Sequence, residues 1–210
     1  MALVKYNNNS ISAITTAGSI ASGSMVLIKE QTASSSASIS FVDGSGGVVL
    51  DNTYPIYKFV FINVHQATDV AHLTFQGSTN TGSSYGVTAT STFFYSSHAE
   101  ADGGEQLSYW TARDLAQSTS FQPLGEDAGN DNDQNYCGEL LLFNPSSTTF
   151  VKHFMSKVQS TMRSDYSTQA HVGGYLNTTS SIDAIQFKMN SGNIDSGTFK
   201  LYGIKDSWWQ

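Results

Sequence analysis

The sequence of 210 residues is poor in the residue types that define several large protein classes. A single cysteine, Cys137, excludes an intrachain disulfide and a cysteine-based zinc site. Only 3 prolines occur beside 18 glycines, so the chain is neither collagen-like nor a proline-rich linker. No apolar run approaches the roughly 18 residues of a membrane-spanning helix, and no apolar signal segment is visible. We therefore expect neither membrane insertion nor a signal peptide.

Charged residues are also scarce, at 13% of the chain, which is about half the usual share in a soluble domain. The 10 basic residues are outnumbered by 17 acidic ones and form no cluster, so nucleic-acid binding is not expected. Serine and threonine supply roughly a quarter of the residues. Because 39% of the residues are hydrophobic, this composition favours a folded domain with a hydroxyl-rich surface over a disordered chain.

Short apolar runs with the alternation of β-strands begin at Met25 and recur to the end of the chain. Segment 57–64 is apolar on both faces, which predicts a central strand. Segment 150–162 suits a helix or a strand, and we favour a strand because a turn precedes it and no capping box is present. Asp195-Ser196-Gly197 is interpreted as the turn that separates the last two strands. Strands are expected over residues 25–30, 38–42, 57–64, 71–76, 88–95, 139–143, 150–162, 169–177, 182–189 and 198–204.

This series of strands predicts an all-β fold, an antiparallel β-sandwich of the jelly-roll kind, over residues 25–210. Residues 1–24 hold few strong hydrophobes and predict an extended N-terminal arm that orders only on docking to a partner. The docking residues expected in the arm are Leu3, Tyr6, Ile11 and Ile14. The adjacent indoles of Trp208 and Trp209 are expected to pack against the domain or a neighbouring subunit as an assembly contact.

Acidic residues concentrate between Glu100 and Glu139, a segment in which Arg113 is the only basic residue. Such a concentration of charge must be solvated, divided by folding, or bound to a cation. Within the segment, Asp131, Asp133 and Asn135 have the spacing of the first ligands of a calcium loop. Tyr136 and Leu142 stand where an EF-hand requires glycine and glutamate. A looser Ca²⁺ site is therefore one interpretation, and a solvated polar loop is the other.

Other candidate chemistry in the sequence is weak. His98, Glu100 and Asp102 would share one face of an extended segment, either as a metal or acid–base cluster or as a strand that runs out into a loop. Asp195-Ser196-Gly197 matches the aspartic-protease signature, but that chemistry needs two carboxylates and only one copy is present. No nucleophile elbow, phosphate loop or dinucleotide fingerprint occurs. We therefore predict that the chain has no catalytic residues and is not an enzyme.

Two stretches resemble virion structural proteins of tailed bacteriophages, especially those of marine bacteria. One is the opening, residues 1–5 followed by Asn7-Asn8-Asn9-Ser10-Ile11-Ser12. The other is residues 187–204, which resemble the terminal hairpin of β-sandwich domains in such proteins. The resemblance implies a tail-fibre, tail-associated or head-decorating building block whose arm anchors a displayed sandwich.

The partners that follow from this resemblance are other virion proteins and copies of the chain itself, with a host-surface glycan as a further candidate. The expected location is the virion, assembled in the host cytoplasm. One alternative is a free carbohydrate-binding module, using exposed aromatic rings and the calcium loop. A weaker alternative is a glycan hydrolase with two carboxylates from the acidic segment. The tyrosines expected in turns or irregular segments, where a ring could stack on a sugar, are Tyr6, Tyr54, Tyr85, Tyr109, Tyr136 and Tyr166.

Overall fold

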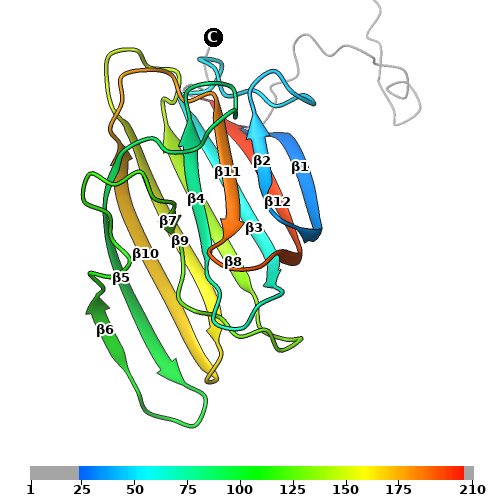
Figure 1. Cartoon of the computed structure of the whole chain (residues 1–210), viewed down its shortest axis with the longest axis vertical. Coiled ribbons are helices and arrows are strands. Elements are labelled where there is room, and N and C mark those ends of the chain that lie inside the picture. The colour runs from blue at the N-terminus through cyan, green and yellow to red at the C-terminus, as the bar shows by residue number, and fades with distance from the viewer. Residues whose placement is uncertain (1–23, 206–210) are drawn as a thin grey trace, which may run out of the picture.

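The computed structural model describes residues 24–205, which form two antiparallel β-sheets packed face to face (Figure 1). This confirms the predicted all-β sandwich. In the described part of the chain, no helix is long and apolar enough to cross a membrane. The strands are β1 (Met25–Ser36), β2 (Ile39–Val42), β3 (Ile56–Gln66), β4 (Leu73–Ser78), β5 (Ala89–Ala99), β6 (Gln106–Tyr109), β7 (Gln122–Pro123), β8 (Tyr136–Phe143), β9 (Lys152–Met162), β10 (Tyr166–Leu176), β11 (Ala184–Met189) and β12 (Ile194–Ile204).

The larger sheet has eight strands in the order β1-β12-β3-β8-β9-β10-β5-β6, and the smaller sheet has four in the order β2-β11-β4-β7. The first four strands of the chain pair with later strands in a nested order, so that the earliest strand pairs with the last one. β1 pairs with β12, β2 with β11, β3 with β8 and β4 with β7. Strands β9, β10, β5 and β6 continue the larger sheet beyond this nested set, toward the left of Figure 1.

The hydrophobic core lies between the sheets and is centred on the ring of Phe187 from β11. Its centroid lies 5.1 Å from that of Phe61 on β3 and 5.6 Å from that of Phe199 on β12. Because successive side chains of a strand point to opposite faces, a strand such as β9 contributes every second residue to this core. The five rings around Phe187 come from both sheets and are Phe41, Phe59, Phe61, Phe75 and Phe199.

The two strands that the sequence singled out are both present. β3 is the third strand of the larger sheet, as expected of a central strand, with Tyr57 and Phe59 buried. β9 alternates buried and exposed residues along most of its length, so the strand interpretation of segment 150–162 is confirmed. Phe154 and Val158 point into the core, whereas Phe150 precedes the strand and is 69% exposed.

The structure corrects two expectations about the C-terminal part of the chain. Residues 187–204 do not form a hairpin, because β11 lies in the smaller sheet and β12 in the larger one. Asp195-Ser196-Gly197 is not a turn before the last strand, because β12 already begins at Ile194. The register between β12 and β3 shifts on both sides of Ser196, so these residues form an irregular part of a strand. A β-bulge uses the same small and polar residue types as a turn, which explains the wrong prediction.

Candidate functional site

The loop between β7 and β8, residues 124–135, has a buried base and an exposed tip. Glu126, Ala128 and Gly129 of the base are buried, whereas Asp131 and Asp133 of the tip are exposed. The prediction of a solvated polar loop is therefore right only for the tip. The base packs between the sheets, and the tip lies at the end of the sandwich where β3, β8 and β12 meet.

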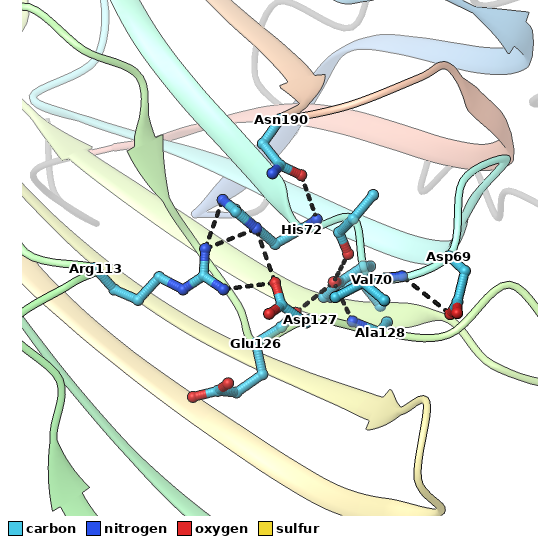
Figure 2. Close-up of polar contacts among 10 residues, drawn as sticks. Asp69, Val70, His72, Arg113, Glu126, Asp127, Ala128 and Asn190 are labelled. Carbon is cyan, nitrogen blue, oxygen red and sulfur yellow. Dashed lines mark hydrogen bonds and ion pairs between the residues drawn. The ribbon is translucent and has the colours of Figure 1, made fainter.

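An ionic cluster holds the base of this loop (Figure 2). Arg113 donates from Nη2 to Oδ1 of Asp127 over 2.5 Å, and its Nη1 lies 2.8 Å from Nε2 of His72. Nδ1 of His72 lies 3.0 Å from Oδ1 of Asp127. The guanidinium also lies 4.9 Å from the centre of the Trp110 ring, a cation–π distance. The cluster thus joins the residue before β4, the β6–β7 connection and the loop.

The surroundings of His72 favour a neutral imidazole. Nη1 of Arg113 lies at nearly equal distances from the two ring nitrogens, 2.7 Å from Nδ1 and 2.8 Å from Nε2, so a positive charge on the ring would face the guanidinium charge directly. Burial, together with the charge of Arg113, lowers the pKa of His72. Burial alone would raise the pKa of Asp127, but the hydrogen bond from His72 and the charge of Arg113 outweigh it and lower that pKa. The ionic core of the cluster is therefore the Arg113–Asp127 pair.

Glu126, next to Asp127, is buried without a partner. Its side chain leaves the cluster and points away from it in Figure 2. Both carboxylate oxygens are buried and accept no hydrogen bond from the described residues. Burial raises the pKa of Glu126 to about 7, and the charge of Asp127 adds to this effect while that of Arg113 opposes it. The carboxyl group is therefore protonated in the folded protein well above the pH at which an exposed glutamate ionises.

Because the Glu126 carboxyl group is buried, we predict that this one residue makes the stability of the protein depend on pH. The folded protein keeps the Glu126 proton up to about pH 7, whereas the unfolded chain releases it near the ordinary value of 4.5. Raising the pH through this window therefore favours unfolding. Relative to Glu126→Gln, the wild-type protein should lose about 3 kcal/mol of unfolding free energy between pH 4 and pH 8. Urea unfolding of both proteins across this range measures the difference.

The variant Glu105→Gln is the control for this experiment, because Glu105 is an exposed glutamate of the same acidic segment. It should follow the pH dependence of the wild-type protein. A wild-type stability that stays parallel to that of Glu126→Gln from pH 4 to pH 8 would show that Glu126 is ionised normally in the folded protein.

Two further side chains, those of Tyr136 and Gln66, make hydrogen bonds to the backbone of the loop base. The hydroxyl of Tyr136 accepts a hydrogen bond from the amide of Ala128 over 3.0 Å and donates to the carbonyl of Ala71 over 2.8 Å. The side-chain amide of Gln66 donates to the carbonyl of Gly129. Tyr136 is fully buried, so the expectation that its ring could stack on an external sugar is wrong. Tyr136 is the first residue of β8 and points to the same buried side of that strand as Leu140 and Leu142.

A polar pocket opens at the tip of the loop, where β3 and β12 are both irregular. The register of β3 with β8 shifts between Phe61 and Val64. Between these residues, Asn63 adopts a left-handed backbone with φ of 50°. Opposite it, Gly197 has φ of 132°, and a Cβ there would lie 2.6 Å from Cα of Val64. Bulges of this kind redirect side chains from the regular alternation of a strand, and here they turn polar groups outward.

The pocket has a volume of about 480 Å³ and is lined by groups from two strands, β3 and β12, and from the loop. Nε2 of His65 lies 3.1 Å from the carbonyl oxygen of Asp131, and its Nδ1 lies 3.6 Å from Oδ2 of Asp195. His65 thus connects the loop tip to β12. Sγ of Cys137 lies 3.5 Å from Oδ1 of Asn135, so the single thiol lies next to the pocket. The lining residues are Asn63, His65, Asn132, Asn135, Asp195 and Ser196.

The structure places the sequence-predicted site residues in different positions. Of the proposed calcium ligands, Asn135 lines the pocket, while Asp131 contributes a backbone carbonyl to His65 and Asp133 is exposed. The side chains of these three do not form a carboxylate cluster in the described chain. The arm residues Leu3, Tyr6, Ile11 and Ile14, and the indoles of Trp208 and Trp209, lie outside the described residues.

The acidic segment is divided by folding. Glu126 and Asp127 lie in the loop base, whereas Asp102 and Glu105 lie near His98 at the β5–β6 turn. Nε2 of His98 is 3.7 Å from Asp102 and 3.6 Å from Glu105, and all three side chains are exposed. The sequence grouped His98 with Asp102 but missed Glu105, which only the turn of the chain brings back. β5 ends at Ala99, as the strand-to-loop interpretation predicted.

No protein-family model, curated protein or solved structure matches this chain.

Proposed function

We propose that this chain is a non-enzymatic structural component of a bacteriophage virion, tail-associated or head-decorating, that assembles with copies of itself and with other virion proteins. The observation that carries the proposal is the outer face of the eight-stranded sheet, defined here as the side chains of that sheet that point away from the core. This face has no covering layer within the described chain.

The outer face carries four large side chains, Leu27, Tyr202, Leu141 and Met155, along one row that also holds Lys58, Gly173 and Thr92. Two residues that lie opposite each other on neighbouring strands point to the same face of a sheet. Following such pairs from β1 to β5 gives a row with one residue from each of seven strands. Within this row Leu27 is 49% exposed and Met155 is 58% exposed. In the neighbouring row, Phe94 stacks on His171 with ring centroids 4.9 Å apart. The row consists of Leu27, Tyr202, Lys58, Leu141, Met155, Gly173 and Thr92.

Two ion pairs within the chain lie on the outer face, which also carries the exposed Lys157. Lys200 lies 2.9 Å from Glu30, and Lys58 lies 2.5 Å from Glu139. The formal net charge of the whole chain is −7, so most of the excess negative charge lies elsewhere. Two copies can therefore bring these faces together without strong electrostatic repulsion, which favours a second copy of the chain as the occupant. A surface with exposed apolar side chains is also typical of an interaction site.

The nested strand pairing adds support for a structural role. β1-β12-β3-β8 faces β2-β11-β4-β7, the arrangement of a long hairpin folded into two sheets, and this supports the predicted jelly-roll-like form. Jelly rolls recur in viral capsid proteins and in lectins. A hydrolase is less well supported, because the carboxyl group with the raised pKa, Glu126, has both oxygens buried and out of reach of a substrate.

The proposal predicts that the outer face controls association. Met155→Asp places a carboxylate next to Leu141 in this row, and a desolvated carboxylate is costly at an interface. The wild-type protein should form an oligomer in light scattering, and the variant should associate at least tenfold more weakly. In purified particles, mass spectrometry should detect the wild-type chain and much less of the variant.

The matched control is Phe150→Asp, because Phe150 is also more than half exposed but lies before β9. It should associate like the wild-type protein. A wild-type chain that stays monomeric, or a Met155→Asp variant with unchanged mass, would contradict the use of this face. Particles without any peptide of the chain would contradict the virion role itself.

A further inference from the structure

We infer that the pocket at the loop tip, lined by Asn63, His65, Asn132, Asn135, Asp195 and Ser196, is a binding site for a neutral sugar unit. The inference does not rest on the assembly role and is tested on the isolated chain. The volume of the pocket, about 480 Å³, lies within the range of small-ligand sites.

The pocket is held in shape before any ligand binds. The loop base is held by the Arg113–Asp127 pair and by Tyr136, and the tip by the hydrogen bond from His65 to the Asp131 carbonyl. On the other side, the close approach of Gly197 to Val64 fixes the bulge that presents Asp195. A site assembled on such supports loses little conformational entropy on binding, which favours affinity.

The lining offers unused hydrogen-bonding capacity. Within residues 24–205, the side chains of Asn132 and Ser196 make no hydrogen bond, and that of Asn135 makes only long contacts. Asn63 contacts only the thiol of Cys137 through its side chain, over 3.6 Å. These amide and hydroxyl groups present donors and acceptors side by side, and a sugar hydroxyl, which is both donor and acceptor, pairs with both kinds of group.

Charge selects against other ligands. The one carboxylate in the lining, Asp195, repels a phosphate or another anion, and no lysine or arginine lines the pocket to bind one. A Ca²⁺ site needs six to eight oxygen ligands, usually with several carboxylates. The carboxylates of Asp131 and Asp133 do not line the pocket. A neutral, hydroxyl-rich ligand fits the remaining chemistry best.

A second pocket, of about 320 Å³, provides the comparison. It is lined in part by Tyr85, Ser84 and Asn177. There the side chain of Asn177 already donates to Gln117 over 2.8 Å, and Ser84 accepts from Asn80 over 2.9 Å. Two of its polar side chains, those of Asn177 and Ser84, are thus already occupied within the chain. This pocket serves as the internal control.

Saturation-transfer NMR of the full chain tests the inference. The probes are the methyl glycosides of glucose, galactose, mannose and N-acetylglucosamine, each measured with Ca²⁺ and with EDTA. At least one should receive saturation in both conditions. Asn132→Ala and Asp195→Ala should weaken its binding about tenfold or more, since each loses a hydrogen bond to the ligand. Both residues are exposed, so both variants should fold.

The controls are Asp133→Ala, in the same loop but outside the pocket, and Asn177→Ala in the second pocket. Both should bind like the wild-type protein. The inference is overturned if none of the four sugars receives saturation, if saturation requires Ca²⁺, or if Asn177→Ala abolishes it while Asn132→Ala does not.

Discussion

Replacing Phe187 with alanine should lower the free energy of unfolding by about 4 kcal/mol, the usual cost of removing a large buried aromatic ring. Phe187 is fully buried, and five phenylalanine rings surround it from both sheets. The smaller sheet has only four strands, so its central strand β11 depends on this contact with the larger sheet. Urea unfolding followed by tryptophan fluorescence measures the loss.

The matched control is Phe150→Ala, which removes the same ring from a position that is 69% exposed. Its effect should stay within about 0.5 kcal/mol. Equal losses in the two variants would mean that Phe187 does not have the central place in the core that the structure gives it.

Arg113→Ala should cost about 3 kcal/mol, because it removes one partner of a largely buried ion pair. The side chains of Arg113 and Asp127 are only 12% and 22% exposed, so Asp127 would keep a charge with little access to water. The hydrogen bond to His72 and the contact with Trp110 would be lost as well. Urea unfolding at pH 7 measures the effect. Arg113→Lys should be intermediate, since it keeps the charge but not the planar fork.

The chain has one other arginine, Arg163, which is exposed and serves as the matched control. Arg163→Ala should change stability by less than about 0.5 kcal/mol. If Arg113→Ala were equally mild, the cluster would be a solvated surface contact and would not hold the loop base.

Much of the fold could be predicted from the sequence, because strand formation depends on a pattern with a period of two residues. The alternation of residues 152–160 and the apolar run of β3 are local features, and both strands are found where the pattern placed them. Segment 105–121 fits no period, and it contains only the short strand β6. The sequence pattern did not reveal bulges, since the residue types of Asp195-Ser196-Gly197 are equally typical of a turn.

The candidate site could be predicted only in part. The spacing of Asp131, Asp133 and Asn135 drew attention to the right loop, but to calcium chemistry that their side chains do not form. His65, Asn63 and Ser196 carried no signal, because they come from strands far apart in the sequence. The partners of Arg113 were also hidden, since His72 and Asp127 lie 41 and 14 residues away from it.

The sequence by itself determined that this protein is a β-sandwich with a polar, weakly charged surface, because composition and alternation are properties of neighbouring residues. Only the tertiary structure decided which acidic residues are buried and which face water. It also decided which side chains form the pocket and which apolar residues are left uncovered on the larger sheet. These properties depend on strand order and register, which join residues that are distant in the chain and leave no local pattern.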